Sequence, residues 1–172
     1  FALPAVLPGA LVGLHYGIQL TRPRWGFISD KGGNRTRWII GGMAVLALGA
    51  LAAAFAVTLF ASTPALALGL SLIAYAAIGL GVGASGTSLL ALLATTTAPE
   101  RRAAAATITW LMMIFGIALT AGLAGSFLDP YSPARLMSVV AVVVSGAMLL
   151  TILATGRIEQ GLKVATQEPP TP

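Results

Sequence analysis

Residues 38–99 read WIIGGMAVLALGALAAAFAVTLFASTPALALGLSLIAYAAIGLGVGASGTSLLALLATTTAP and carry no charged side chain. A helix needs roughly 20 mainly apolar residues to cross the hydrocarbon core of a membrane, so this stretch has room for two crossings. Proline disfavours helix at the residue before it, and Ser62-Thr63-Pro64 therefore marks the break. The stretch predicts two transmembrane helices joined by a short, uncharged turn.

The rest of the chain follows the same pattern. Of its 172 residues, 57% are hydrophobic and only 9% are charged, and the mean hydropathy is +0.90. A soluble domain typically carries about a quarter charged residues, because its surface must be wetted. We therefore predict an all-α polytopic membrane protein in which residues 1–156 form a transmembrane helical bundle. The expected spans are about 1–21, 38–60, 65–96, 104–128 and 134–156.

Glycines recur along these expected spans. Helices in lipid associate through close packing of small residues, so rows of glycine favour a compact bundle over independent membrane anchors. The rows are Gly9 and Gly13 in the first span, Gly79, Gly81, Gly83 and Gly86 in the third, and Gly116, Gly122 and Gly125 in the fourth.

Basic residues concentrate in alternate loops, at 22–37, around 97–103 and after 156. The positive-inside rule assigns such loops to the cytoplasm, which puts residue 1 on the periplasmic side and residue 172 on the cytoplasmic side. We expect a further span upstream, making six helices in this half of the protein. Residues 157–172 are expected to form a cytoplasmic tail or the start of a central linker.

Two other classes of function are disfavoured. The net charge of +5 could suggest nucleic acid as a partner, but the basic residues lie between apolar spans with no aromatic-basic surface. The chain has no cysteine, which excludes disulfides, thiolate metal sites and thiol catalysis. No cluster of nucleophile, base and acid occurs in or near the spans, so we do not expect an enzyme.

The loop RPRWGFISDKGGNRTRW, residues 22–38, holds half of the basic residues. It resembles the G-x-x-x-D-(R/K)-x-G-(R/K) motif between the second and third helices of the major facilitator superfamily. The resemblance implies a major-facilitator-type helical bundle in which this loop latches the two halves at the cytoplasmic face. The alternative is a solvated basic loop without a latch. The latch residues are Gly26, Asp30, Lys31, Gly33, Arg35 and Arg37.

A second loop, TTTAPERR, carries Pro99, Glu100 and Arg101. It resembles the P-E-x-R loop between helices four and five of the same superfamily, so the five visible spans would be helices two to six. Intramembrane charge is the usual marker of ion-coupled transport. Apart from Arg135 at the start of the last span, the expected spans contain no Asp, Glu, Lys or Arg, which disfavours ordinary proton-driven transport.

Residues 91–140, ALLATTTAPERRAAAATITWLMMIFGIALTAGLAGSFLDPYSPARLMSVV, are similar to the PucC/LhaA family, the bacteriochlorophyll-delivery branch of that superfamily. LhaA-like proteins look closer than PucC proper, whose fourth helix is richer in His, Thr and Gln than GASGTS at 83–88. The resemblance implies a factor that assembles light-harvesting (LH1-type) complexes in the cytoplasmic or intracytoplasmic photosynthetic membrane of a bacterium. It would bind or deliver bacteriochlorophyll, or guide antenna polypeptides around the reaction centre. Carotenoid and lipid are further candidate ligands, and membrane lipids are expected partners.

His15 is the only histidine and lies within the first span. Its imidazole is a candidate ligand for the magnesium of bacteriochlorophyll, and no other metal site is expected. The competing interpretation is a hydrogen bond made within the helix bundle. For the polar side chains of Thr87, Ser88, Thr107 and Thr109, bonding to the helix backbone is the competing interpretation.

Two alternative functions stay open beside the assembly factor. The first is a conventional secondary transporter of an amphipathic solute such as a tetrapyrrole. The second is a structural subunit held permanently beside a photosynthetic complex. Co-purification with antenna polypeptides separates both complex-bound hypotheses from the transporter, and stoichiometry then separates an assembly factor from a permanent subunit.

Overall fold

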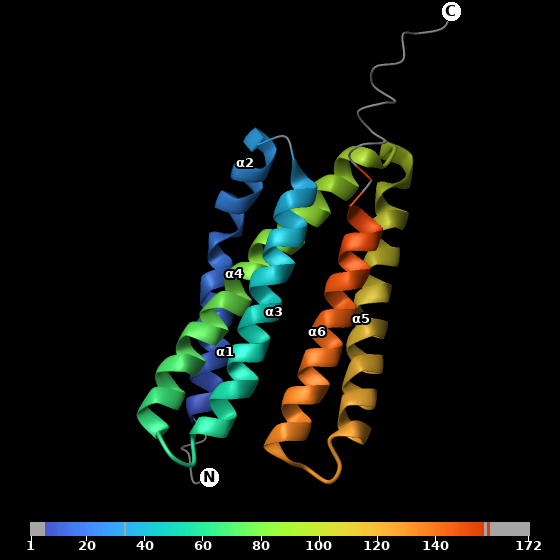
Figure 1. The fold of residues 1–172 in the computed structure, drawn as a ribbon. Coiled ribbons are helices and arrows are strands. Elements are labelled where there is room, and N and C mark those ends of the chain that lie inside the picture. Colours follow the sequence, from blue (N-terminus) through green and yellow to red (C-terminus); the bar gives the residue numbers. More distant parts are fainter. Residues whose placement is uncertain (1–5, 33, 157, 159–172) are drawn as a thin grey trace, which may run out of the picture.

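The structure is a computed structural model that describes residues 6–32, 34–156 and 158, without the side chains of 28–32. Every regular element in this part of the chain is a helix (Figure 1). The elements in chain order are α1 (Val6–Ile18), η1 (Gln19–Thr21), α2 (Arg22–Gly32), α3 (Arg35–Leu59), α4 (Pro64–Thr96), η2 (Pro99–Arg101), α5 (Arg102–Phe127) and α6 (Pro133–Thr155).

Four helices, α3, α4, α6 and α5 with its preceding turn η2, are long and apolar enough to cross a membrane. The ends of α3, α4, α5 and α6 themselves lie within three residues of the expected ranges. Local chemistry explains the boundaries. Pro64 and Pro133 stand in the first turns of α4 and α6, where a missing backbone N–H costs nothing. The Ser132 hydroxyl accepts a hydrogen bond from the Arg135 backbone N–H at 3.1 Å and so caps α6.

The described part of the first expected span, residues 6–21, is helical, whereas the loop predicted after it is wrong. The described helix α1 covers 13 residues and is not among the four candidate spans. Residues 22–32, which we expected to form a loop, continue the helix as α2. The physical reason is packing: Trp25 lies against Gly83 of α4, while Arg22 and Arg24 remain exposed. High charge density suggested a loop, but the segment is helical and keeps its two described arginines exposed.

Glycines allow α3 and α4 to cross very closely. A Cβ atom built on Gly42 would lie 2.6 Å from the Ser85 backbone nitrogen, and one on Gly81 would lie 2.6 Å from the Gly42 carbonyl oxygen. Gly79 plays the same part against α1, because its Cβ would lie 2.8 Å from the His15 carbonyl oxygen. The expected packing through small residues is therefore present around α4, which also contacts α2.

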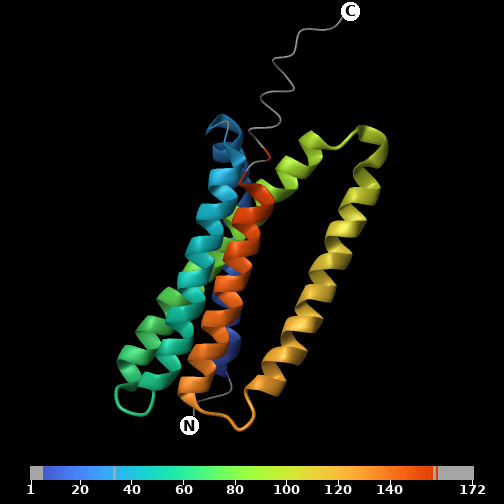
Figure 2. The same cartoon turned by 45° about the vertical axis from the view of Figure 1, so that its right-hand side comes forward.

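Helix α5 does not join this packing. None of its residues is buried in the described structure, and it contacts α4 and α6 only sparsely. Figure 2 shows it standing apart from the other helices. Gly116, Gly122 and Gly125 have nothing within 4 Å of a Cβ position. The expectation that these three glycines pack against a neighbouring helix is not met among the described residues, because no helix lies against that part of α5.

Candidate functional site at the basic end of the bundle

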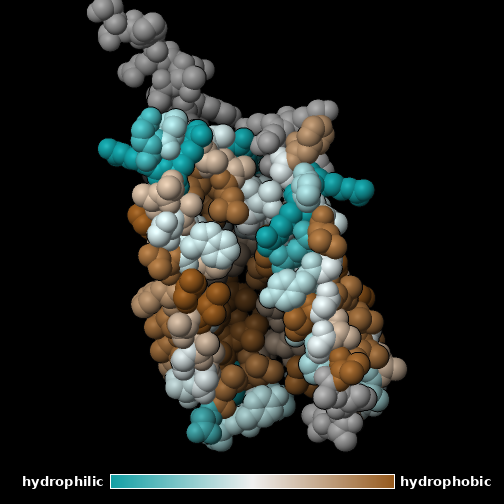
Figure 3. Space-filling model, turned by 180° about the vertical axis from the view of Figure 1, so that it is seen from behind, coloured by the Kyte–Doolittle hydropathy of each residue, from teal (hydrophilic) through white to brown (hydrophobic). Residues whose placement is uncertain are grey.

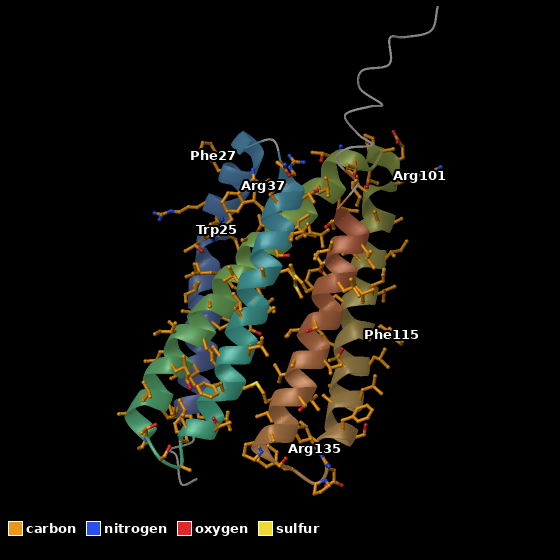
Figure 4. The ribbon with its side chains drawn as sticks, viewed as in Figure 1. Trp25, Phe27, Arg37, Arg101, Phe115 and Arg135 are labelled. Carbon is orange, nitrogen blue, oxygen red and sulfur yellow. The ribbon has the colours of Figure 1, made fainter. Side chains whose placement is uncertain are left out.

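One end of the bundle gathers α2, the start of α3, the end of α4, η2, the start of α5 and the end of α6 (Figure 1). We call it the basic end. Figure 4 places Arg37 and Arg101 there and Arg135 at the opposite end. The described arginines of the basic end are Arg22, Arg24, Arg35, Arg37, Arg101 and Arg102.

Two hydrogen-bonded contacts tie the start of α3 to the ends of two other helices. The Arg35 guanidinium donates to the Ala91 carbonyl oxygen at 3.1 Å and to the Thr95 hydroxyl. A cation is favourable at these positions, because the carbonyl groups of a helix C-terminus carry partial negative charge. The Thr36 hydroxyl donates to the Thr155 carbonyl oxygen of α6 at 3.4 Å, in a buried contact. The predicted latch segment therefore contains residues that join α3, α4 and α6.

The remaining latch residues are only partly described. Gly26 faces α4, where its Cβ would lie 3.3 Å from the Thr87 methyl group, which agrees with the expected close approach of helices. Arg37 is exposed, and the Asn34 side chain caps α3 by accepting a hydrogen bond from the Arg37 backbone N–H at 3.2 Å. The side chains of Asp30 and Lys31, and all of Gly33, lie outside the described residues. Pairing between Asp30 and an arginine stays a prediction.

The second loop motif forms η2, a short 3-10 helix in which Pro99 begins the turn. Glu100 and Arg101 are exposed. Among the described elements η2 contacts only α5. The two motifs thus lie at the same end of the bundle without touching each other.

His15 sits in a chain of hydrogen bonds along α1. Its Nε2 lies 2.7 Å from Nε2 of Gln19, and the Gln19 Oε1 accepts from the Arg22 guanidinium. The arginine fixes the amide orientation, since only oxygen can accept from it. The Gln19 nitrogen must then donate to His15, which makes Nε2 the acceptor and leaves the proton on Nδ1.

This tautomer has no lone pair free for a metal. Nδ1 is buried and has no hydrogen-bond partner among the described residues, while Nε2 is used by Gln19. His15 in this arrangement does not fit as a ligand for the magnesium of bacteriochlorophyll. The geometry favours the hydrogen-bonding interpretation.

Two of the four other polar candidates bond to their own helix. The Thr107 hydroxyl donates to the Ala103 carbonyl oxygen at 3.0 Å, and the Thr109 hydroxyl donates to the Ala105 carbonyl oxygen at 2.8 Å. The Ser88 hydroxyl is buried and has no partner in the described structure. These threonines are therefore satisfied by the backbone, as the competing interpretation required.

A cavity of about 640 Å³ lies between α5 and α6, at the end opposite to the basic end. Its wall is mainly apolar and includes Leu123, Phe127 and Val139. The charged residues in its lining are Asp129 and Arg135. The Arg135 guanidinium donates to the carbonyl oxygens of Asp129 and Pro130 at 2.6 and 3.0 Å. Arg135 therefore stabilises the turn between the two helices.

The helices and their apolar surfaces define a multi-pass helical membrane protein. The family described as PUCC protein matches residues 1–172, and the chain belongs to this family. It is 67% identical over 161 residues to a Rhodobacter capsulatus protein named "Bacteriochlorophyll synthase 44.5 kDa chain". The match covers 94% of this chain and 38% of that relative, so the chain spans well under half of the relative's length. No solved structure matches the chain.

Family membership confirms the PucC resemblance. The closer likeness to LhaA-like proteins and the arrangement of a major facilitator half rest on sequence motifs and stay predictions.

Proposed function

We propose that the chain is part of a membrane-embedded factor that assembles LH1-type light-harvesting complexes in photosynthetic bacteria. The factor guides antenna polypeptides around the reaction centre and handles bacteriochlorophyll while doing so. Membership of the PUCC family supports this proposal. The name of the Rhodobacter capsulatus relative connects that protein with bacteriochlorophyll, which gives the pigment part of the proposal its support.

The observation that carries the proposal is the exposed apolar surface of α5, which no other described helix covers. Large apolar side chains surround this helix, and those of Trp110, Met112 and Phe115 are 56%, 70% and 68% exposed. Transmembrane helices associate through close contact at small residues. Gly116, Gly122 and Gly125 leave α5 open to such contact, because nothing lies within 4 Å of their Cβ positions. We assign this surface to the apolar transmembrane helix of an antenna polypeptide.

The surroundings of α5 extend the apolar surface. Figure 3 shows the back of the molecule hollowed between its two sides, with hydrophobic residues lining the hollow. Figure 2 shows the separation of α5 from the rest of the bundle that produces this hollow. A helix lying along α5 would bury apolar surface on both sides of the hollow.

The proposed role is not catalytic, although the relative is named as a chain of a synthase. Among the described residues no three His, Cys, Asp or Glu side chains are grouped to hold a metal ion. Thr107 and Thr109 donate to carbonyl groups of α5 itself. We expect membranes that lack the protein to retain bacteriochlorophyll synthesis while losing assembled LH1 complexes.

The proposed orientation places the basic end in the cytoplasm. Arginines crowd this end, whereas Arg135 at the other end is engaged by backbone carbonyl groups beside Asp129. The positive-inside rule gives the basic end to the cytoplasmic side.

Site-directed crosslinking tests the role of α5. A photoreactive benzoylphenylalanine replaces Phe115 in the full-length protein, in cells that are assembling LH1 complexes. Ile73 of α4 is the matched control, because its side chain is 69% exposed and equally apolar. We expect antenna polypeptides to be captured at position 115 and not at position 73. Capture of antenna polypeptides at neither position, or only a crosslink to another part of the same chain, would overturn the assignment of α5.

A further inference from the structure

A second cavity lies at the basic end, between α2, α3 and α4, and has a volume of about 620 Å³. The assembly function proposed above does not use it. Its lining changes along the helices, from polar near the basic end, with Asn34 and Arg37, to apolar towards the middle of α3 and α4, with Val45 and Leu80. We call the polar part the mouth. A cavity with this gradient suits an amphiphile that has one charged end.

Two tryptophans form the wall nearest the mouth. The rings of Trp25 from α2 and Trp38 from α3 lie with their centroids 5.8 Å apart and their planes at 54°. The indole N–H of Trp25 donates to the Thr21 hydroxyl at 2.9 Å, which satisfies its polar edge. Tryptophan is enriched where a membrane changes from headgroup to hydrocarbon. This pair therefore places the mouth of the cavity at headgroup level.

The apolar part of the cavity exists because glycine leaves it open. A Cβ atom on Gly41 would meet nothing within 4 Å. At its neighbour Gly42 the space for a Cβ atom is already occupied by the backbone of α4. Val45 lies four residues further along α3, and Leu80 faces the same space from α4. Both side chains are about two-fifths exposed, at 40% and 38%. Together they continue the cavity towards the hydrocarbon region.

The charge on the cavity lining indicates which charged end of an amphiphile the cavity can bind. Among the described residues, Arg37 is the only charged one that lines the cavity, and its exposed guanidinium stands in the first turn of α3. The positive end of the helix dipole adds to its attraction for an anion. The cavity between α5 and α6 differs, because there Arg135 lies with Asp129 and donates to two carbonyl groups. Of these two cavities, the one at the basic end presents an uncompensated cation among its described lining residues.

We propose that this cavity binds one anionic glycerophospholipid. The phosphate lies on the Arg37 guanidinium, which binds phosphate oxygens through paired N–H groups. The glycerol region lies against Trp25 and Trp38, and an acyl chain follows Gly41 and Val45 into the hydrocarbon. A free phosphate uses only the mouth of the cavity, and a zwitterionic phospholipid carries a cation beside its phosphate that offsets the attraction of Arg37. The lipid site is separate from the α5 surface and does not depend on the proposed function.

Native mass spectrometry of the full-length protein, titrated with dioleoylphosphatidylglycerol, measures this binding. We expect Arg37→Gln to weaken binding of the tightest lipid by about fivefold, the effect of one basic residue near an anionic membrane surface. Arg37→Lys should keep most of the affinity. Arg24→Gln is the control, because Arg24 is exposed on α2 and does not line the cavity. Equal loss in Arg37→Gln and Arg24→Gln would overturn the site, as would equal affinity for phosphatidylcholine.

A second pair of variants tests the apolar part. Gly41→Leu fills the cavity, while Gly146→Leu adds the same side chain to α6, where a Cβ also meets nothing within 4 Å. We expect the first variant to lose the tightest lipid and the second to retain it, with both proteins remaining monodisperse. Retention in Gly41→Leu contradicts the proposal. Competition by glycerol phosphate at the affinity of the intact lipid would show a site for phosphate alone and would also overturn it.

Discussion

Exchange of Gly42 for alanine tests the close crossing of α3 and α4. The new Cβ would lie 2.6 Å from the Ser85 backbone nitrogen and 2.9 Å from the Gly81 carbonyl oxygen, whereas ordinary contacts begin at 3.4 Å. Because both opposing atoms belong to the backbone, no side chain can rotate away, and the helices must separate locally. Overpacking of this kind costs about 1–3 kcal/mol.

The neighbouring glycine provides the control. Gly41→Ala adds the same methyl group to the same helix, but nothing lies within 4 Å of it. Alanine favours helix over glycine by about 1 kcal/mol at either position, so this term cancels in the comparison. We expect Gly42→Ala to be less stable than Gly41→Ala by about 1–3 kcal/mol.

Heating the detergent-solubilised protein and measuring the remaining monodisperse fraction by size-exclusion chromatography reports the difference. Each kcal/mol corresponds to a shift of roughly 2–4 °C in the melting temperature of a protein of 150–250 residues. Equal melting temperatures for the two variants, or a higher one for Gly42→Ala, would refute the close crossing of α3 and α4.

Three further predictions concern single side chains. Arg35→Gln should lower the free energy of unfolding by about 1.5–3 kcal/mol, because it removes charged hydrogen bonds to the last turns of α4. The control Arg24→Gln should change the free energy of unfolding by less than about 0.5 kcal/mol. Thermal melts of the two variants measure the difference. His15→Leu should leave the bacteriochlorophyll content of the purified protein unchanged, because Nε2 already accepts from Gln19; loss of pigment from folded protein would show ligation. Ser132→Ala should destabilise α6 by about 1 kcal/mol through loss of its cap, and unchanged melting would contradict the capping role.

The long helices could be predicted from sequence because their determinants are local. Uncharged runs of sufficient length require helices in a membrane, and Pro64 and Pro133 mark where two of them begin. The ends of α3 to α6 accordingly fall close to the expected positions. The family could also be predicted, because the second loop and the segment from Asp129 to Leu136 resemble it over a continuous stretch.

The helix α2 could not be predicted, because it depends on a partner distant in sequence. The segment's charge suggested a loop, whereas Trp25 packs beside Gly83 of α4. The same limit applies to the glycines: Gly81 and Gly116 look alike in sequence, yet only Gly81 meets a neighbouring helix. A glycine in the sequence indicates that another helix can approach closely at that position. Only the arrangement of the helices shows at which glycines one does.

The hydrogen bond between His15 and Gln19 could have been predicted from the spacing of residues in the sequence. His15 and Gln19 are four residues apart, and Gln19 and Arg22 are three apart. Side chains at these spacings are neighbours on a helix surface, so a continuous helix through residue 22 would have predicted their hydrogen bonds. Because a loop was expected from residue 22 onward, the hydrogen bond between Gln19 and Arg22 was not predicted.

The assembly of antenna complexes is the function proposed for the full-length protein. Its most direct test is mild solubilisation and affinity purification of the full-length protein from cells that are forming photosynthetic membranes. The absorption spectrum and the co-purifying polypeptides are then measured together. We predict bacteriochlorophyll absorption and LH1 antenna polypeptides in the purified fraction, with the protein absent from most mature complexes. A colourless protein that purifies without antenna polypeptides would contradict the account.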